Sequence, residues 1–146
     1  MKLYTIGLTQ KNAETFFELL RQNGVRCLID IRLKPNGQLA GFAKQSDLPY
    51  FLDKLVYGCQ YIYMPELAPT EDILNEYRKS RDWQQYAQHF ERLMDERNIP
   101  KTLKKEDFTS EPCCLLCSEP TPEKCHRRLV AERLATYWTD MEIIHL

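Results

Sequence analysis

The fold prediction starts from residues 113–133, which read CCLLCSEPTPEKCHRRLVAER. With Pro112 before it, the opening apolar run is short enough to be a fully buried strand. A polar loop follows, and Thr121 as N-cap, Pro122 at the first helical position and Glu123 in the first turn predict a helix that begins there. The strand and the helix would therefore meet around a dense set of reactive side chains: Cys117, Glu119, Cys125, His126 and Arg127.

The predicted helix has an apolar face that also carries a charged residue. At about 100° per residue, Arg127 falls on the same face as Val130, Ala131 and Leu134. A buried charge needs a partner, so two interpretations stay open. Arg127 forms an ion pair with a carboxylate, or it holds an anion together with the N–H groups of the helix start. Cys125 lies opposite this face and is either exposed or covered by the preceding loop.

Outward from this stretch, strands and helices alternate along the chain. Strands are predicted over 3–6, 25–31, 59–64 and 141–145, and helices over 11–23, 46–57, 70–77 and 81–98. A loop is expected over 33–45 and a polar, lysine-rich linker over 100–111. The alternation predicts an α/β fold. We expect a single domain over 1–146 with three layers, a mainly parallel sheet of about five strands, and a Rossmann-like arrangement.

Composition bounds the function. The chain has 146 residues, of which 43% are hydrophobic and 28% charged, with a net charge of −1. This charge gives no general attraction to nucleic acid or to membranes. No apolar run approaches the ~20 residues of a membrane span, and the N-terminal apolar segment is too short for a signal peptide. We therefore expect a cytoplasmic protein without a membrane partner, whose cysteines are free thiols, ligands or catalysts.

Polar residues follow the expected strands at their carboxyl ends, where open parallel sheets bind ligands. These ends carry Gly7, residues 30–32, residues 65–66 and residues 117–119. Asp30 with Arg32 is either a structural pair or an acid/base group beside an anion holder, and Glu66 can also be a loop cap. The catalytic candidates are Asp30, Glu119, Cys125 and His126, and the ligand-binding candidates are Thr5, Gly7, Arg32, Glu66, Cys117 and Arg127.

The cysteines allow a metal interpretation. Cys114 and Cys117 are spaced as C-x-x-C, but residues three apart in a strand point to opposite faces, so this pair is not expected to bind one ion. A metal site would use Cys117, Cys125 and His126. The favoured interpretation assigns no metal and leaves the cofactor open. It expects Cys125, near a helix N-terminus, to have a lowered pKa and to react faster than Cys113 or Cys114.

Several short motifs resemble a known family. They are T-I-G at 5–7, D-x-R at 30–32, L-A-G-F at 39–42, P-E-L-A-P-T at 65–70, L-L-C-x-E with P-E-x-C-H-R at 115–127, and I-H-L at 144–146. The chain resembles the family called domain of unknown function 488 over essentially its whole length. The resemblance implies an α/β fold and a site around the cysteine-histidine-arginine motif, and it implies no particular reaction.

The leading hypothesis is an enzyme-like domain that binds a phosphate-bearing ligand, either a nucleotide or nucleic acid. Arg32, Arg127 and the helix N-terminus would hold the anion. Asp30, Glu119 and His126 would be the acid/base candidates. The alternatives are a transition-metal-binding protein and a non-catalytic module that recognises nucleic acid or a partner protein. The oligomeric state is left open.

Overall fold

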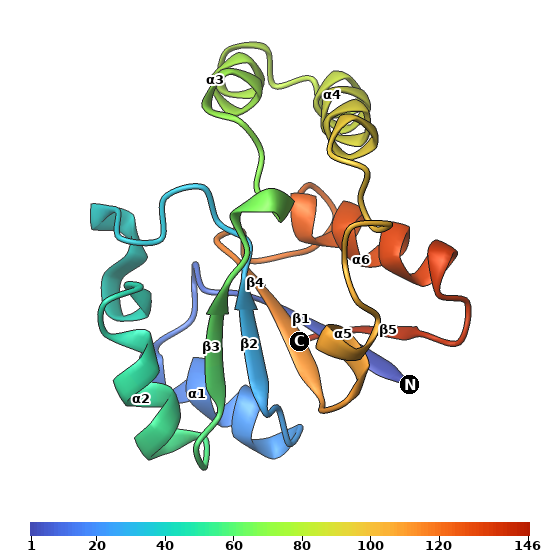
Figure 1. The fold of residues 1–146 in the computed structure, drawn as a ribbon. Coiled ribbons are helices and arrows are strands. Elements are labelled where there is room, and N and C mark those ends of the chain that lie inside the picture. Colours follow the sequence, from blue (N-terminus) through green and yellow to red (C-terminus); the bar gives the residue numbers. More distant parts are fainter.

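The computed structural model describes the backbone of residues 1–146 and the side chains of all of them except Leu39. The part of the L-A-G-F motif that falls on the Leu39 side chain therefore lies outside the described residues. One sheet contains all the strands, in the order β3-β2-β4-β1-β5, and every neighbouring pair is parallel (Figure 1). The strands are β1 (Lys2–Gly7), β2 (Cys27–Asp30), β3 (Gln60–Tyr63), β4 (Cys113–Cys117) and β5 (Glu142–His145).

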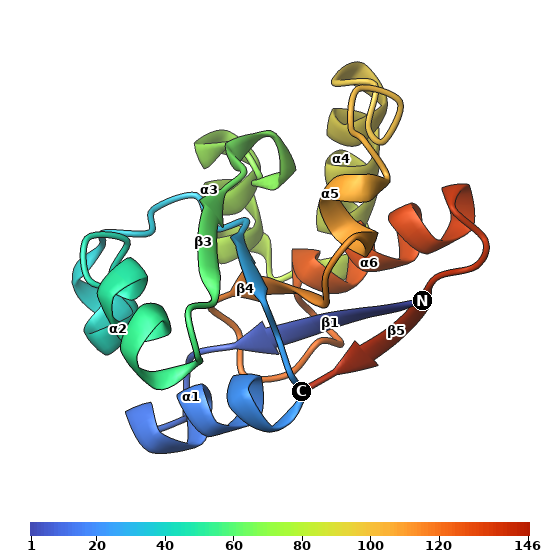
Figure 2. The same cartoon turned by 60° about the horizontal axis from the view of Figure 1, so that its bottom comes forward.

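Helices cover both faces of this sheet, which confirms the predicted three-layer α/β fold (Figures 1 and 2). One face is covered by α1 (Ala13–Gln22) and α2 (Leu48–Leu55). The other is covered by α4 (Trp83–Glu96), α5 (Glu106–Thr109) and α6 (His126–Tyr137), and α3 (Glu71–Ser80) packs against α4. Two short 3-10 helices, η1 (Gln38–Ala43) and η2 (Pro65–Leu67), lie in the connections.

Alternate residues of the three central strands, β2, β4 and β1, divide between two hydrophobic cores. On β4, Leu115 packs with Phe90 of α4 in one core, whereas Leu116 packs with Phe16 of α1 in the other. Both leucines are fully buried. The sheet is therefore apolar on both faces, as a covered parallel sheet must be. Four of the cysteines belong to these cores: Cys27, Cys59, Cys113 and Cys114.

The topology opens a crevice at the end of β4. The chain leaves β1 and β2 toward α1 and α2 on one face, but it leaves β4 toward α6 on the opposite face. Since β4 lies between β2 and β1, the connections diverge on both of its sides, and such points are where open α/β sheets bind ligands. The order places β4, rather than β1, beside β2 and in this respect differs from the dinucleotide-binding fold.

Two local predictions are wrong. The helix after β4 begins at His126 with Cys125 as its N-cap, not at Pro122. Arg127 donates a hydrogen bond from Nη1 to the Glu119 carbonyl oxygen at 2.5 Å. This contact keeps the loop across the end of β4, so the residues from Pro122 to Lys124 do not join the helix. The polar stretch 100–111 is not only a surface linker, because it contains α5, whose Phe108 is fully buried.

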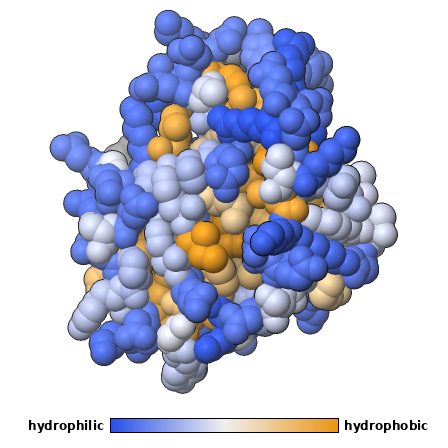
Figure 3. All heavy atoms as spheres, viewed as in Figure 1, coloured by the Kyte–Doolittle hydropathy of each residue, from blue (hydrophilic) through white to orange (hydrophobic). Residues whose placement is uncertain are grey.

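The surface is mainly polar. Figure 3 shows hydrophilic residues over most of the face seen in Figure 1, with apolar residues between them toward the middle of that face. None of the helices formed by the described residues combines the length and the apolar character that a membrane crossing requires.

Candidate functional site

A cavity of about 400 Å³ lies beyond the carboxyl ends of β2 and β4. Five of the predicted site residues line it: Arg32, Cys117, Glu119, Cys125 and His126. They come from the segment after β2, the end of β4 and the start of α6. The volume is in the range of small-molecule sites. The cavity therefore occupies the crevice that the strand order creates.

Cys117 and His126 face each other at the cavity wall. The Cys117 Sγ lies 3.3 Å from the His126 Nδ1. The other ring nitrogen, Nε2, is 2.8 Å from the Ile31 carbonyl oxygen. A carbonyl oxygen can only accept, so Nε2 carries the proton and donates it. In the neutral imidazole, Nδ1 then carries a lone pair and no proton, and Cys117 Sγ lies to the side of that lone pair, 3.9 Å from Nε2.

The two cysteines of the cavity differ in acidity. Burial raises the pKa of Cys117. A hydrogen bond with the Cys125 thiol, two backbone N–H groups and the Arg127 charge lower it, and their combined effect is larger than that of burial. The pKa of Cys117 therefore lies below its ordinary value. The pKa of Cys125 is raised well above its ordinary value, first by burial and then by the hydrogen bond to Cys117. Cys125 is also only 2% exposed. The predicted lowered pKa of Cys125 is therefore wrong, because the loop covers this thiol and Cys117 takes the hydrogen bonds.

Asp30 and Arg32 form a buried ion pair at the end of β2. Arg32 donates from Nε to Asp30 Oδ1 at 2.8 Å and from Nη2 to Oδ2 at 2.7 Å. The Tyr61 hydroxyl donates to the same Oδ2 at 2.6 Å, and Arg32 Nη2 also reaches the Ala43 carbonyl oxygen at 2.7 Å. Asp30 therefore forms the structural pair with Arg32 that was one of the two interpretations of the sequence. Arg32 Nη1, however, is buried and has no partner among the described residues.

Arg127 is fully buried behind the cavity and does not line it. Besides the Glu119 carbonyl, it donates from Nε to the Thr5 hydroxyl at 3.2 Å. The predicted ion pair is not formed, because no carboxylate pairs with Arg127 among the described residues, and its Nη2 has no partner there. Gly7 is needed at this point, since a Cβ would lie 1.6 Å from the Glu119 oxygen and 2.8 Å from the Arg127 Nη1.

The remaining predicted residues lie away from the cavity surface. Thr5 and Gly7 belong to β1 beneath the loop, and Asp30 lies behind Arg32. Glu66 is exposed in η2, and its carbonyl oxygen accepts a hydrogen bond from Arg97 Nη1 at 2.8 Å. The structure therefore brings half of the predicted set to one cavity and places the rest in its support or elsewhere.

Sequence analysis missed most of the cavity wall. Three further cations line it, Lys34, Arg78 and Lys124, and so do Tyr77 and Tyr86. Lys124 immediately precedes the cysteine-histidine-arginine motif, which was a usable signal. Helix periodicity places Tyr77 and Tyr86 on inward faces, but periodicity does not distinguish a core from a cavity wall.

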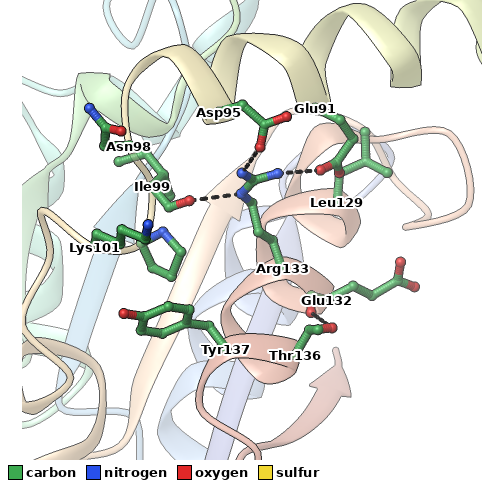
Figure 4. Close-up of a pocket in the computed structure, with 11 residues that line it drawn as sticks. Glu91, Asp95, Asn98, Ile99, Lys101, Leu129, Glu132, Arg133, Thr136 and Tyr137 are labelled. Carbon is green, nitrogen blue, oxygen red and sulfur yellow. Dashed lines mark hydrogen bonds and ion pairs between the residues drawn. The ribbon is translucent and has the colours of Figure 1, made fainter.

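A second cavity, of about 600 Å³, lies between α4 and α6 (Figure 4). Figure 4 shows the Arg133 guanidinium directed at two carboxylates: Nη1 donates to Glu91 at 2.6 Å, and Nη2 donates to Asp95. Its Nε donates to the Ile99 carbonyl oxygen at 2.9 Å. The central charges of this cavity are therefore already paired, and no cysteine or histidine is among its described lining residues. The cavity at the end of β4 is the stronger candidate.

Fold and site together define a three-layer α/β protein with a thiol- and imidazole-lined cavity at the carboxyl edge of a parallel sheet. Residues 12–134 match the sequence model described as Domain of unknown function DUF488, so the chain belongs to this family. The match confirms the resemblance over 12–134, a range that leaves out the T-I-G motif at 5–7 and the I-H-L motif at 144–146. No curated protein and no solved structure matches the chain.

Proposed function

We propose that the protein binds a phosphate-bearing small molecule in the cavity at the end of β4. The observation that carries this proposal is the free donor of Arg32: its Nη1 is buried without a partner among the described residues, and the residue lines the cavity. A buried donor without a partner costs free energy, which a phosphate oxygen would recover. Asp30 and Tyr61 hold the guanidinium in place, so Arg32 would receive the ligand with little rearrangement.

The charges around the cavity support an anionic ligand. Arg78 and Lys124 join Arg32 on the wall, and Lys34 lies there too but pairs with Glu71 at 2.9 Å, whereas Glu119 is the one carboxylate among the described lining residues. The whole chain has a net charge of −1, so this excess of positive charge is local. A cleft lined by one sign of charge raises the concentration of oppositely charged ligands.

The shape of the cavity favours a nucleotide-sized molecule over nucleic acid. A volume of about 400 Å³ suits a small ligand, and Tyr77 and Tyr86 provide aromatic surface that could contact a base. In this proposal Arg32 and Lys124 hold the phosphate, and His126 and Glu119 are the groups able to move a proton. Asp30 positions Arg32, and Arg127 with Thr5 and Gly7 supports the loop.

The test is a titration of the metal-free, chelator-treated protein with pyrophosphate and with a mononucleotide, followed by thermal melting. A ligand at about 100 times its Kd stabilises the folded state by about 2.7 kcal/mol. We expect Arg78→Gln and Lys124→Gln to weaken this stabilisation. Lys79→Gln is the matched control, because Lys79 is exposed beside Arg78 and does not line the cavity.

Two outcomes would contradict the proposal. One is a wild-type protein that neither pyrophosphate nor the nucleotide stabilises. The other is equal stabilisation of all variants, which would place the anion elsewhere on the surface. Binding of single-stranded oligonucleotides, with no response to the mononucleotide, would favour the nucleic-acid alternative.

A further inference from the structure

Three side chains with soft donor atoms converge at the inner wall of the cavity. The sulfur atoms of Cys117 and Cys125 and a ring nitrogen of His126 all lie within 4.8 Å of one another, and all three residues are buried. The sequence separates Cys117 from the other two by a loop, and the turn of that loop brings them together. The other four cysteines lie within the hydrophobic cores.

We infer that Cys117, Cys125 and His126 bind one transition-metal ion of the zinc class. Thiolate and imidazole ligands select zinc, copper or iron over magnesium and calcium, which prefer oxygen. The favoured interpretation of the sequence assigned no metal. The structure favours the metal interpretation more than the sequence does, because the three donor atoms lie close together in space and not only in the sequence.

The orientation of His126 supports this inference. Metal-binding histidines usually donate the second ring N–H to a carboxylate or a backbone carbonyl, and here Nε2 has that bond with Ile31. The free nitrogen, Nδ1, is 3.3 Å from Cys117 Sγ. Two such ligands on a tetrahedral zinc ion are roughly 3.5 Å apart, given Zn–S and Zn–N distances of about 2.3 and 2.0 Å. The two donor atoms therefore lie at nearly the separation that the ion requires, and binding would turn the imidazole ring, because Cys117 Sγ is also 3.9 Å from Nε2 and lies to the side of the Nδ1 lone pair.

The backbone holds these donors at defined positions. Cys117 ends β4, which is hydrogen-bonded to β1 and β2 on its two sides. Cys125 is the N-cap of α6 and His126 is its first residue. Arg127 fixes the loop between them through the Glu119 carbonyl oxygen. A site placed on regular elements in this way loses little conformational entropy when the ion binds.

The number of ligands indicates an open site. No fourth cysteine, histidine, aspartate or glutamate joins the group among the described residues. Structural zinc sites have four protein ligands, whereas sites with three protein ligands keep one position for water or substrate. All three residues line the cavity, so the remaining position would be occupied by a water molecule or by a ligand bound there.

The experiment measures metal content without reference to any reaction. The purified protein is reduced with a phosphine, loaded with zinc, freed of excess metal and analysed by mass spectrometry. We expect stoichiometric zinc in the wild type and in the control Cys59→Ser, whose thiol lies in a core, and a large loss of zinc in Cys117→Ser and Cys125→Ser. Cobalt in place of zinc should give tetrahedral d–d bands and a thiolate charge-transfer band, both lost in His126→Gln.

Wild-type protein that retains no zinc after this treatment overturns the inference. Equal zinc retention by Cys125→Ser and the wild type also overturns it, because the ion would then lie elsewhere. Circular dichroism shows whether each variant is folded. If a variant is unfolded, the cobalt spectrum of the wild type tests the inference instead, and the absence of a thiolate charge-transfer band would overturn it. Since the anion titration uses metal-free protein, either proposal can fail without the other.

Discussion

Two arginines are buried on the two sides of β4, and the protein compensates their charges in different ways. Arg32, beyond β2, has a carboxylate partner in Asp30 through two parallel hydrogen bonds. Arg127, beside β1, binds only neutral oxygens, the Thr5 hydroxyl and the Glu119 carbonyl. Each guanidinium leaves one nitrogen without a partner among the described residues.

In the proposed function, this difference separates a ligand-binding group from a supporting group. Arg32 lines the cavity, and its carboxylate partner keeps it in one orientation. Arg127 does not line the cavity, but its charge is among the causes that lower the pKa of Cys117. Burial alone therefore does not identify a ligand-binding arginine. The partner and the cavity surface have to be considered together.

The largest effect is expected from Asp30→Ala. This change leaves the Arg32 charge buried without its carboxylate and removes the acceptor of the Tyr61 hydroxyl. Breaking one side of a buried ion pair typically costs about 3–5 kcal/mol of unfolding free energy. Denaturant unfolding, with the midpoint and slope fitted together, measures the loss.

The control is the same substitution at an exposed ion pair. Asp53 pairs with Lys54 at 3.7 Å, and both side chains are more than half exposed. Asp53→Ala should change the stability by no more than about 1 kcal/mol. The double variant with Asp30→Ala and Arg32→Met should be more stable than Asp30→Ala alone, because it removes the stranded charge. Similar losses for Asp30→Ala and Asp53→Ala would mean that the Asp30 pair does not compensate a buried charge.

An intermediate effect is expected from Arg127→Met. No carboxylate loses its partner. The loss of unfolding free energy should therefore reflect two hydrogen bonds and the two acceptors left without a donor, about 1–3 kcal/mol. Pyrophosphate should still stabilise this variant, since Arg127 does not line the cavity. Arg128→Met, at a partly exposed position of the same helix, is the control. Loss of anion binding in a folded Arg127→Met protein would instead make Arg127 the anion holder.

Much of the fold could be predicted from the sequence. Apolar runs bounded by glycine and polar residues identified every strand, and the five strands are parallel as the alternation with helices indicated. The start of α6 could not be predicted, because Thr121, Pro122 and Glu123 form a good local helix start. The Glu119–Arg127 contact joins residues whose proximity depends on the end of β1, and no local pattern contains it.

The candidate site could be predicted in part. Cys117, Cys125 and His126 fall in one motif, and strand polarity places Arg32 at the same edge. The roles of the two cysteines could not be assigned, because their acidity depends on which thiol the loop covers and which one receives the backbone N–H groups. Tertiary packing brings Lys34, from the segment before η1, and Arg78, from α3, to the cavity, and neither residue carries a periodic signal in the sequence.

The smallest effect on stability is expected at His145, which is linked to Arg127 through the Thr5 hydroxyl. The Thr5 hydroxyl accepts a hydrogen bond from Arg127 and forms a second one with the His145 Nδ1, 2.6 Å away, in which the hydroxyl donates when the ring proton is on Nε2. Partial burial, and then the Arg127 charge, lower the pKa of His145 from 6.5. The unfolded chain therefore binds a proton more readily, and stability should fall as the pH drops below 6.5 toward the folded-state pKa.

Thermal melting across this pH range measures the slope in the wild type and in His145→Gln. Glutamine can still accept the Thr5 hydrogen bond but does not titrate, so we expect the variant to lose part of the pH dependence while the two proteins have similar stability at neutral pH. His89→Gln is the control, since His89 lies on the surface beside Glu76 and has no contact with Arg127. An unchanged slope in His145→Gln would show that neither burial nor the Arg127 charge lowers the pKa of His145, and the two sides of β4 would then differ only in the Asp30 pair.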